Sequence, residues 1–115
     1  MVKHMPNRDE RLDQVFRALA DGSRRDMVER LIRGPATVGE LAKPLAMSLP
    51  AVMQHLQVLR DCGLVRSEKV GRTRTCYVVT DGLRTAEDWL HGQRTDWESR
   101  LDSLGGFLDE QGESP

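Results

Sequence analysis

The stretch MSLPAVMQHLQVLRDCGLV, residues 47–65, carries side chains suited to recognition rather than to catalysis. At about 100° per residue on a helix, one arc collects an apolar stripe that is expected to face a core. The stripe consists of Leu49, Val52, Leu56 and Leu59. The opposite arc holds two glutamines, small residues and few charges. Ordinary exposed helices are rich in Lys and Glu, so this second face indicates a contact surface.

Amide and hydroxyl side chains can hydrogen-bond the base edges that DNA exposes in its major groove. A helix enters that groove only where its facing side chains permit close approach. Pro50 and Ala51 permit it, and the Gln54 amide can pair with adenine. The candidate DNA-contacting residues of this helix are Ser48, Pro50, Ala51, Gln54, His55 and Gln57. The alternative is the ordinary polar side of an amphipathic helix.

A basic ribbon is expected directly after this helix. In LVRSEKVGRTRTCYVV, strand-forming residues flank Gly71-Arg72, which favours a tight reversal and a β-hairpin. Lys69, Arg72 and Arg74 would lie on this hairpin, in a wing spanning residues 66–76, where they could meet phosphates or a minor groove. Plain solubility is the alternative role for these three cations.

Charge is segregated along the chain, although the net charge of the 115 residues is only −1. Residues 47–79 contain five Lys or Arg and two Asp or Glu, a net of +3. Residues 80–115 contain three Arg and nine Asp or Glu, a net of −6. A polyanionic partner responds to the local field, so the basic segment is compatible with nucleic-acid binding.

The surrounding elements predict a single domain that is mainly α with a small β-hairpin. Apolar periodicity indicates helices over residues 9–20, 24–33, 37–45 and 48–62, the third beginning at a Thr37-x-x-Glu40 capping box. Gly63 is placed to end the fourth helix. Helices followed by a hairpin, with a short turn between the third and fourth, describe a winged helix-turn-helix. We expect it to occupy residues 8–80, with residues 1–7 disordered or tag-like.

The C-terminal part predicts a long helix over residues 81–110, followed by a disordered tail at 111–115. Large apolar residues recur every seven positions, which requires burial of one stripe against another helix. A single DNA-binding module buries little surface, so we expect a homodimer through the first and last helices. The expected interface residues are Leu12, Val15, Phe16, Leu83, Leu90, Trp97, Leu101 and Leu104. Burial within one protomer is the alternative, above all for Trp89.

Other classes of protein find little support in the composition. Charged residues make up 30% of the chain and no apolar run reaches the length of a membrane span, so we expect a cytoplasmic protein without membrane contact. There is no phosphate loop and no nucleophile-base motif, so we expect neither an enzyme nor a cofactor. Cys62 and Cys76 could form a thiol switch, although two structural thiols are the plainer interpretation.

With those residues identified, the chain resembles the ArsR/SmtB family of dimeric winged-helix repressors. FRALADGSRRDMVERL is similar to the opening segment of that family, and TVGELAKPLAMSLPAVMQHLQVLRDCGLVRSEKVGRTRTCYVV is similar to its central pattern. The resemblance covers about residues 12–104. It implies a homodimer that binds an imperfect palindromic operator in double-stranded DNA, often in its own promoter, and leaves when a signal arrives.

The chain departs from the metal-sensing members of this family. ELAKPLAMS has no cysteine where those members carry a Cys-x-Cys type motif. Asp88, His91 and Asp96 on the last helix lack a second His and a clear partner set, so we expect no metal site. A thiol- or metal-responsive sensor, or a winged-helix protein-interaction module, remains the alternative to a plain DNA-binding repressor.

Overall fold

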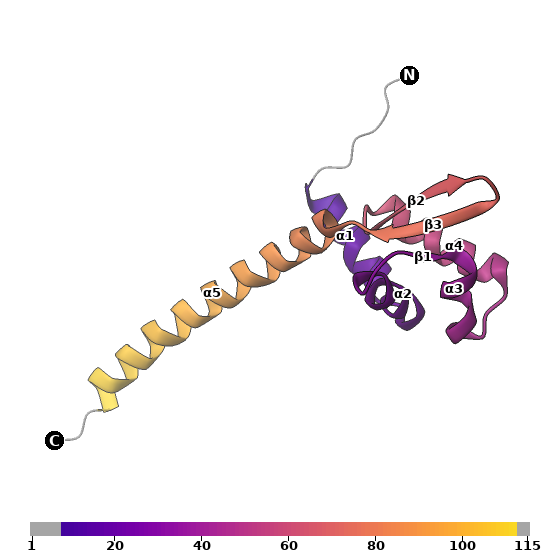
Figure 1. The fold of residues 1–115 in the computed structure, drawn as a ribbon. Coiled ribbons are helices and arrows are strands. Elements are labelled where there is room, and N and C mark those ends of the chain that lie inside the picture. The colour runs from indigo at the N-terminus through magenta and orange to yellow at the C-terminus, as the bar shows by residue number, and fades with distance from the viewer. Residues whose placement is uncertain (1–7, 113–115) are drawn as a thin grey trace.

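The computed structural model describes the backbone of residues 8–112 and the side chains of residues 10–106. Helices and strands follow in the order α1 (Arg8–Leu19), α2 (Gly22–Ile32), β1 (Ala36–Thr37), α3 (Val38–Ala42), η1 (Lys43–Leu45), α4 (Leu49–Asp61), β2 (Val65–Val70), β3 (Thr73–Val78) and α5 (Thr80–Gly112). The expected winged helix-turn-helix is confirmed. Its compact body sits at one end of the molecule, and α5 projects from it as a rod (Figure 1). The expectation for residues 1–7 lies outside the described residues.

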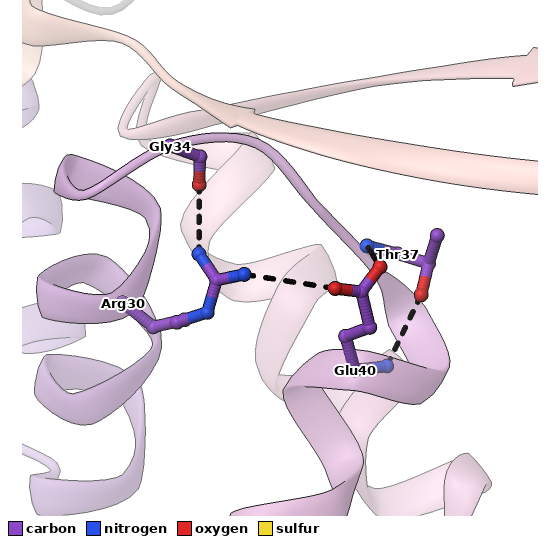
Figure 2. Close-up of polar contacts among 4 residues, drawn as sticks. All are labelled: Arg30, Gly34, Thr37 and Glu40. Carbon is purple, nitrogen blue, oxygen red and sulfur yellow. Dashed lines mark hydrogen bonds and ion pairs between the residues drawn. The ribbon is translucent and has the colours of Figure 1, made fainter.

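The turn between α2 and α3 is fixed by a small set of polar contacts, drawn in Figure 2. Thr37 and Glu40 form the expected capping box, with Glu40 N–H donating to Thr37 Oγ1 (3.1 Å) and Thr37 N–H donating to Glu40 Oε1 (3.2 Å). Arg30 of α2 donates to the Gly34 carbonyl (2.9 Å) and approaches Glu40 at 3.6 Å. These contacts connect the end of α2 to the first turn of α3.

The third helix is shorter than expected. It ends at Ala42 and continues as the 3-10 turn η1, because Pro44 has no N–H to donate to the helical ladder. Ala46 then adopts a left-handed conformation with φ 51°, which turns the chain sharply toward α4. The short turn between the two helices is therefore built from Ala46 and Met47 before the Ser48 cap.

The wing belongs to a three-stranded sheet with the order β1-β3-β2, one strand more than the expected hairpin. β1 pairs antiparallel to β3, with Ala36 opposite Cys76, and is only two residues long. So short a strand leaves no alternating pattern, which is why periodicity missed it. The β2–β3 turn has Gly71 as its first central residue with φ 64°, as a type II′ turn requires.

The core lies between α1, α2, α3, α4 and the sheet. It includes Met27 and Leu31 of α2, Leu41 of α3, and Leu64 and Cys76 of the sheet region. Three of the four expected stripe residues of α4 join it, namely Val52, Leu56 and Leu59. The prediction for Leu49 is wrong, since its side chain is 55% exposed. Leu49 is the first residue of the helix.

α5 is a single helix of 33 residues that leaves the body after its first turns (Figure 1). The radius of gyration is 20.4 Å, against the roughly 13 Å of a compact chain this long. Every side chain from Glu87 to Leu104 is exposed in the isolated protomer. Gly105 and Gly106 do not end the helix, and the prediction of a disordered tail is wrong for Gln111 and Gly112, which are helical. Residues 113–115 lie outside the described part.

No described helix combines the length and apolar character that crossing a membrane requires.

The start of α5 is packed too closely to accept a larger residue at Gly82. A Cβ there would lie 2.8 Å from Leu64 Cδ2 and 3.2 Å from the Gly63 carbonyl oxygen, and Leu64 is fully buried.

We expect Gly82→Ala to lower the free energy of unfolding by about 1–3 kcal/mol, because overpacking strains the core. Urea denaturation measures this change. Gly92→Ala on the same helix is the matched control. No atom lies within 4 Å of a Cβ there, so it should be neutral or stabilising. Equal effects of the two variants would contradict the packing.

Candidate nucleic-acid interface

α4 presents an outer surface that is uncharged over its first three turns. Its first turn is capped by Ser48, whose Oγ accepts from Ala51 N–H (3.3 Å), and Pro50 occupies a position where no N–H is needed. Pro50, Gln54 and Gln57 are exposed and Ala51 is half-buried. Gln57 donates to Asp61 one turn later (2.7 Å). The sequence between Lys43 and Arg60 contains no Lys, Arg, Asp or Glu, so this face is neutral until Asp61 at the end of the helix.

His55 differs from the other candidate residues because it faces the protein. Its Nδ1 lies 3.3 Å from an Arg24 guanidinium nitrogen, which donates only, so Nδ1 is the acceptor and the ring proton resides on Nε2. The same guanidinium donates to the carbonyls of Ala18 (2.7 Å) and Arg17 (3.1 Å) at the end of α1. Through Nδ1, His55 connects α4 to Arg24, while its contact with DNA stays a prediction.

Arg24 is a structurally important residue that the sequence did not single out. Asp21 caps α2 by accepting from the Arg24 N–H (3.1 Å), and this hydrogen bond lowers the pKa of the Asp21 carboxyl. The Arg24 side chain then joins the end of α1 to α4. The only available signal was its place after a helix-capping aspartate, which says nothing about contacts 31 residues further along the chain.

The wing brings two cations directly opposite each other. Lys69 of β2 pairs with Arg74 of β3, and Arg72 is exposed in the turn beyond them. Arg74 is half-buried and donates to Ser67 Oγ (2.9 Å). Like charges directly across two strands destabilise a hairpin unless an anion lies between or beside them. The arrangement is therefore costly in the free protein and favourable against phosphate.

Lys69 and Arg74 lie on the face of the wing that is turned toward the core. Side chains alternate along a strand, so Lys69 and Arg74 lie on the same face as the buried Val65 and Cys76, which is also the face toward α4. The opposite face carries the Arg66–Glu68 ion pair (2.6 Å) and the Arg66 guanidinium over the Tyr77 ring (4.2 Å). The charge of Lys69 and Arg74 thus lies on the side of the wing that faces α4.

Two further exposed residues flank the outer face of α4. Leu49 and Met53 are 55% and 39% exposed, and neither belongs to the core. Leu49 was assigned to the buried stripe from periodicity, and Met53 was not chosen at all. A helical wheel cannot separate the edge of an apolar stripe from the edge of a contact face, so only packing could assign them.

The expected dimer surface divides into an inner and an outer part. Val15 is fully buried in the protomer and Leu83 packs half-buried against the same core, so Val15 is corrected to a core residue. Leu12 is half-buried. Phe16 of α1 makes an edge-to-face contact with Trp89 of α5, and their ring centroids are 5.7 Å apart. The exposed remainder of the expected set is Leu90, Trp97, Leu101 and Leu104 on α5.

An open hollow of about 930 Å³ lies between α1 and α5 beside this surface. Phe16 and Leu19 line it from α1, and Leu83 and Leu90 line it from α5. Phe16 and Leu90 are among the exposed apolar side chains of the protomer. The two helices predicted to form the dimer thus leave apolar surface uncovered at the place where they meet.

The two cysteines are both buried. Cys62 is 7% exposed and its thiol donates to the Leu59 carbonyl (3.4 Å), while Cys76 is 1% exposed. Burial raises the pKa of each thiol. A scarce thiolate in a closed site reacts slowly with oxidants, so the structure disfavours a thiol switch. Among the described residues, no group of three or more His, Cys, Asp or Glu side chains is placed to hold a metal ion.

Comparison with known proteins decides the family. Residues 21–67 match the model for the bacterial regulatory proteins of the arsR family. HTH-type transcriptional regulator Rv2034 of Mycobacterium tuberculosis is 40% identical over 105 residues, 88% of this chain and 92% of the relative. The chain belongs to the ArsR family. Transcriptional repressor SdpR of Bacillus subtilis is 25% identical over 79 residues, 69% of this chain and 88% of its own.

Solved structures agree with this assignment. The crystal structure of an ArsR family transcriptional regulator is 47% identical and superposes with a TM-score of 0.77, covering 83% of this chain and 98% of the other. A homodimeric winged helix-turn-helix DNA-binding domain from Mycobacterium bovis has a TM-score of 0.60 at 24% identity, covering 85% of this chain and 93% of its own, and shows the shared fold. This ArsR-family chain is a DNA-binding transcriptional regulator.

Burial of the thiols makes a testable difference to their chemistry. We expect iodoacetamide at pH 8 to alkylate the native protein more than about tenfold slower than the urea-unfolded chain, because reaction requires opening of the core. The native rate should go on rising above pH 9, since the pKa values are raised. Mass spectrometry of alkylated peptides measures both. Equal native and unfolded rates, together with loss of DNA binding after peroxide, would instead establish the thiol switch.

Proposed function

We propose that this ArsR-family regulator is a homodimeric repressor that binds an imperfect palindromic operator. In each half-site α4 lies in the major groove, and the wing at residues 66–76 meets the flanking phosphates or minor groove. The observation that carries the proposal is the neutral outer face of α4 beside the opposed cations Lys69 and Arg74. Neutral side chains can approach base edges closely, while cations at the margin fix the helix on the backbone.

The proposed base and backbone contacts fall to different residues. Gln54 is exposed at the centre of the outer face, where its amide can pair with adenine. Ser48, Pro50, Ala51 and Gln57 line the same face and allow close approach or reach the groove edge. Lys69, Arg72 and Arg74 contribute to binding at any sequence, because phosphates carry no base identity.

Dimerisation is supported by the bare stripe of α5. Leu90, Trp97, Leu101 and Leu104 are between 45% and 62% exposed along a helix that contacts the body only near its start. Helices in proteins gain most of their stability from packing an apolar face, so we expect a second copy of the chain to pack against this stripe. Two copies also supply the area that one winged helix lacks for specific binding.

Repression follows if the operator overlaps a promoter, since a bound dimer then excludes the polymerase. The name of the relative SdpR, a transcriptional repressor, supports this direction. The proposed operator lies in the promoter of the protein's own gene. Selection of genomic fragments by the purified protein, followed by sequencing, tests this directly. Recovery of fragments without a shared palindrome would overturn the operator proposal.

Wing and helix substitutions should separate two kinds of binding loss. We expect Arg72→Ala or Arg74→Ala to weaken binding to every sequence and to reduce the slope of log affinity against log salt by about two, one contact per wing. Gln54→Ala should instead cost about 1–3 kcal/mol of discrimination at one base position. Fluorescence anisotropy across a salt series measures both.

Arg33→Ala is the control, because Arg33 is an exposed cation at the end of α2 outside the wing. It should leave the salt slope close to that of the wild type. If wing and control variants lose affinity equally, the wing has no special place at the phosphates.

The dimer surface is tested by a charge in the stripe. We expect Trp97→Asp to give a monomer at micromolar concentration in sedimentation experiments, because two carboxylates would be buried against apolar side chains. Specific DNA affinity should fall by more than about tenfold, as half of the contacts are lost. Val70→Asp is the control, since Val70 is 75% exposed at the wing tip and should leave the dimer intact. A dimeric Trp97→Asp protein would contradict the assignment.

A further inference from the structure

The outer face of α4 contains an apolar row that no packing explains. Leu49, Met53 and Gln57 follow one another at intervals of four, so they lie along one side of the helix, with Pro50 and Gln54 on the neighbouring row. Leu49 and Met53 are exposed, and the core against α4 is filled by Val52, Leu56 and Leu59. Met53 and Leu49 therefore expose apolar surface at the margin of the face that the proposed function places in the major groove, with Leu49 at the N-terminal end of the helix.

DNA offers a single apolar group at the base edges of the major groove, the C5-methyl of thymine. The other groups there are hydrogen-bond donors and acceptors, which gain nothing from leucine or methionine. Methionine is suited to such a contact, because its unbranched side chain adapts to the position of the partner. Charge complementarity places DNA on this row, since Lys69 and Arg74 lie on the face of the wing toward α4.

The first three turns of the same helix lack the side chains that commonly identify guanine, and Arg60 lies only in its last turn. Arg and Lys pair bidentately with guanine O6 and N7, and none stands between Lys43 and Arg60. Gln54 and Gln57 are the exposed amides, and Gln57 already donates to Asp61. Gln54 is therefore the residue that can take up the bidentate pairing with adenine.

We propose that α4 reads A·T pairs, with Met53 and Leu49 in contact with thymine methyl groups and Gln54 pairing with adenine. This inference rests on the proposed function, because it requires α4 in the major groove. It goes further by stating which base pairs the helix prefers and which chemical group carries the preference. Met53 and Leu49 become specificity-determining residues, with methyl contact in place of hydrogen bonding.

The test uses DNA that differs only in the methyl group. Duplexes of 30 base pairs are selected by the full-length protein from a random library, and the winning sequence is resynthesised with deoxyuridine in place of thymine at one half-site position at a time. We expect A·T pairs under α4 and a roughly fourfold weaker binding for each contacted thymine, since burial of one methyl-sized group contributes about 0.8 kcal/mol. Anisotropy measures the dissociation constants.

Variants of α4 assign each methyl to a side chain. In Met53→Ala and in Leu49→Ala, uracil substitution at the contacted position should have no further effect. Val58→Ala is the matched control, because Val58 is 37% exposed on the same helix but lines a separate hollow with Gln14 and Arg17. It should keep the full thymine dependence. Circular dichroism confirms that each variant is folded.

The outcomes separate the two proposals. Sequence-selective binding that is indifferent to uracil, or thymine dependence that survives in both Met53→Ala and Leu49→Ala, overturns methyl reading and leaves the repressor proposal standing. A selected half-site of G·C pairs under α4 overturns it as well. Failure of the wild-type protein to select any sequence overturns the proposed function and this inference together.

Discussion

The burial of one side of α4 is the constraint on which the other features depend. Val52, Leu56 and Leu59 are held in the core by α2, α3 and β2, and this fixes the rotation of α4 about its own axis. Because a helix has only one opposite side, the same packing decides that Pro50, Gln54 and Met53 face outward. A rotation of one residue, about 100°, would turn the glutamines toward the core and leave their amides without partners.

Arg24 relates this helix to the rest of the protomer. Its guanidinium donates hydrogen bonds to two carbonyls at the end of α1 and to the ring of His55 on α4. A cation at a helix C-terminus is favourable because the last carbonyls have no partner within the helix. α1 packs against α5, which belongs to the proposed dimer interface. The contact of Arg24 with α1 and α4 therefore helps to fix where α4 lies relative to the proposed dimer axis. Spacing between the two half-sites depends on that position.

Charge and apolar surface are divided between opposite parts of the molecule. The wing combines Lys69, Arg72 and Arg74, while the described part of α5 carries Glu87, Asp88, Asp96, Glu98 and Asp102 between its apolar side chains. Phosphates are attracted to one end and repelled from the rod, so the field orients the protein before contacts form. The near-zero net charge conceals this division, because it sums segments of opposite sign along the whole chain.

The sequence by itself determined the order of helices, the capping box at Thr37, the position of the wing turn and the likeness to the ArsR family. These depend on neighbouring residues, through periodicity, caps and turn chemistry. Tertiary packing alone decided that Leu49 is exposed, that Val15 is buried, that His55 faces Arg24, and that β1 joins the sheet. Each of these depends on contacts between residues far apart in the chain. The local sequence pattern does not indicate which distant side chain packs beside a given residue.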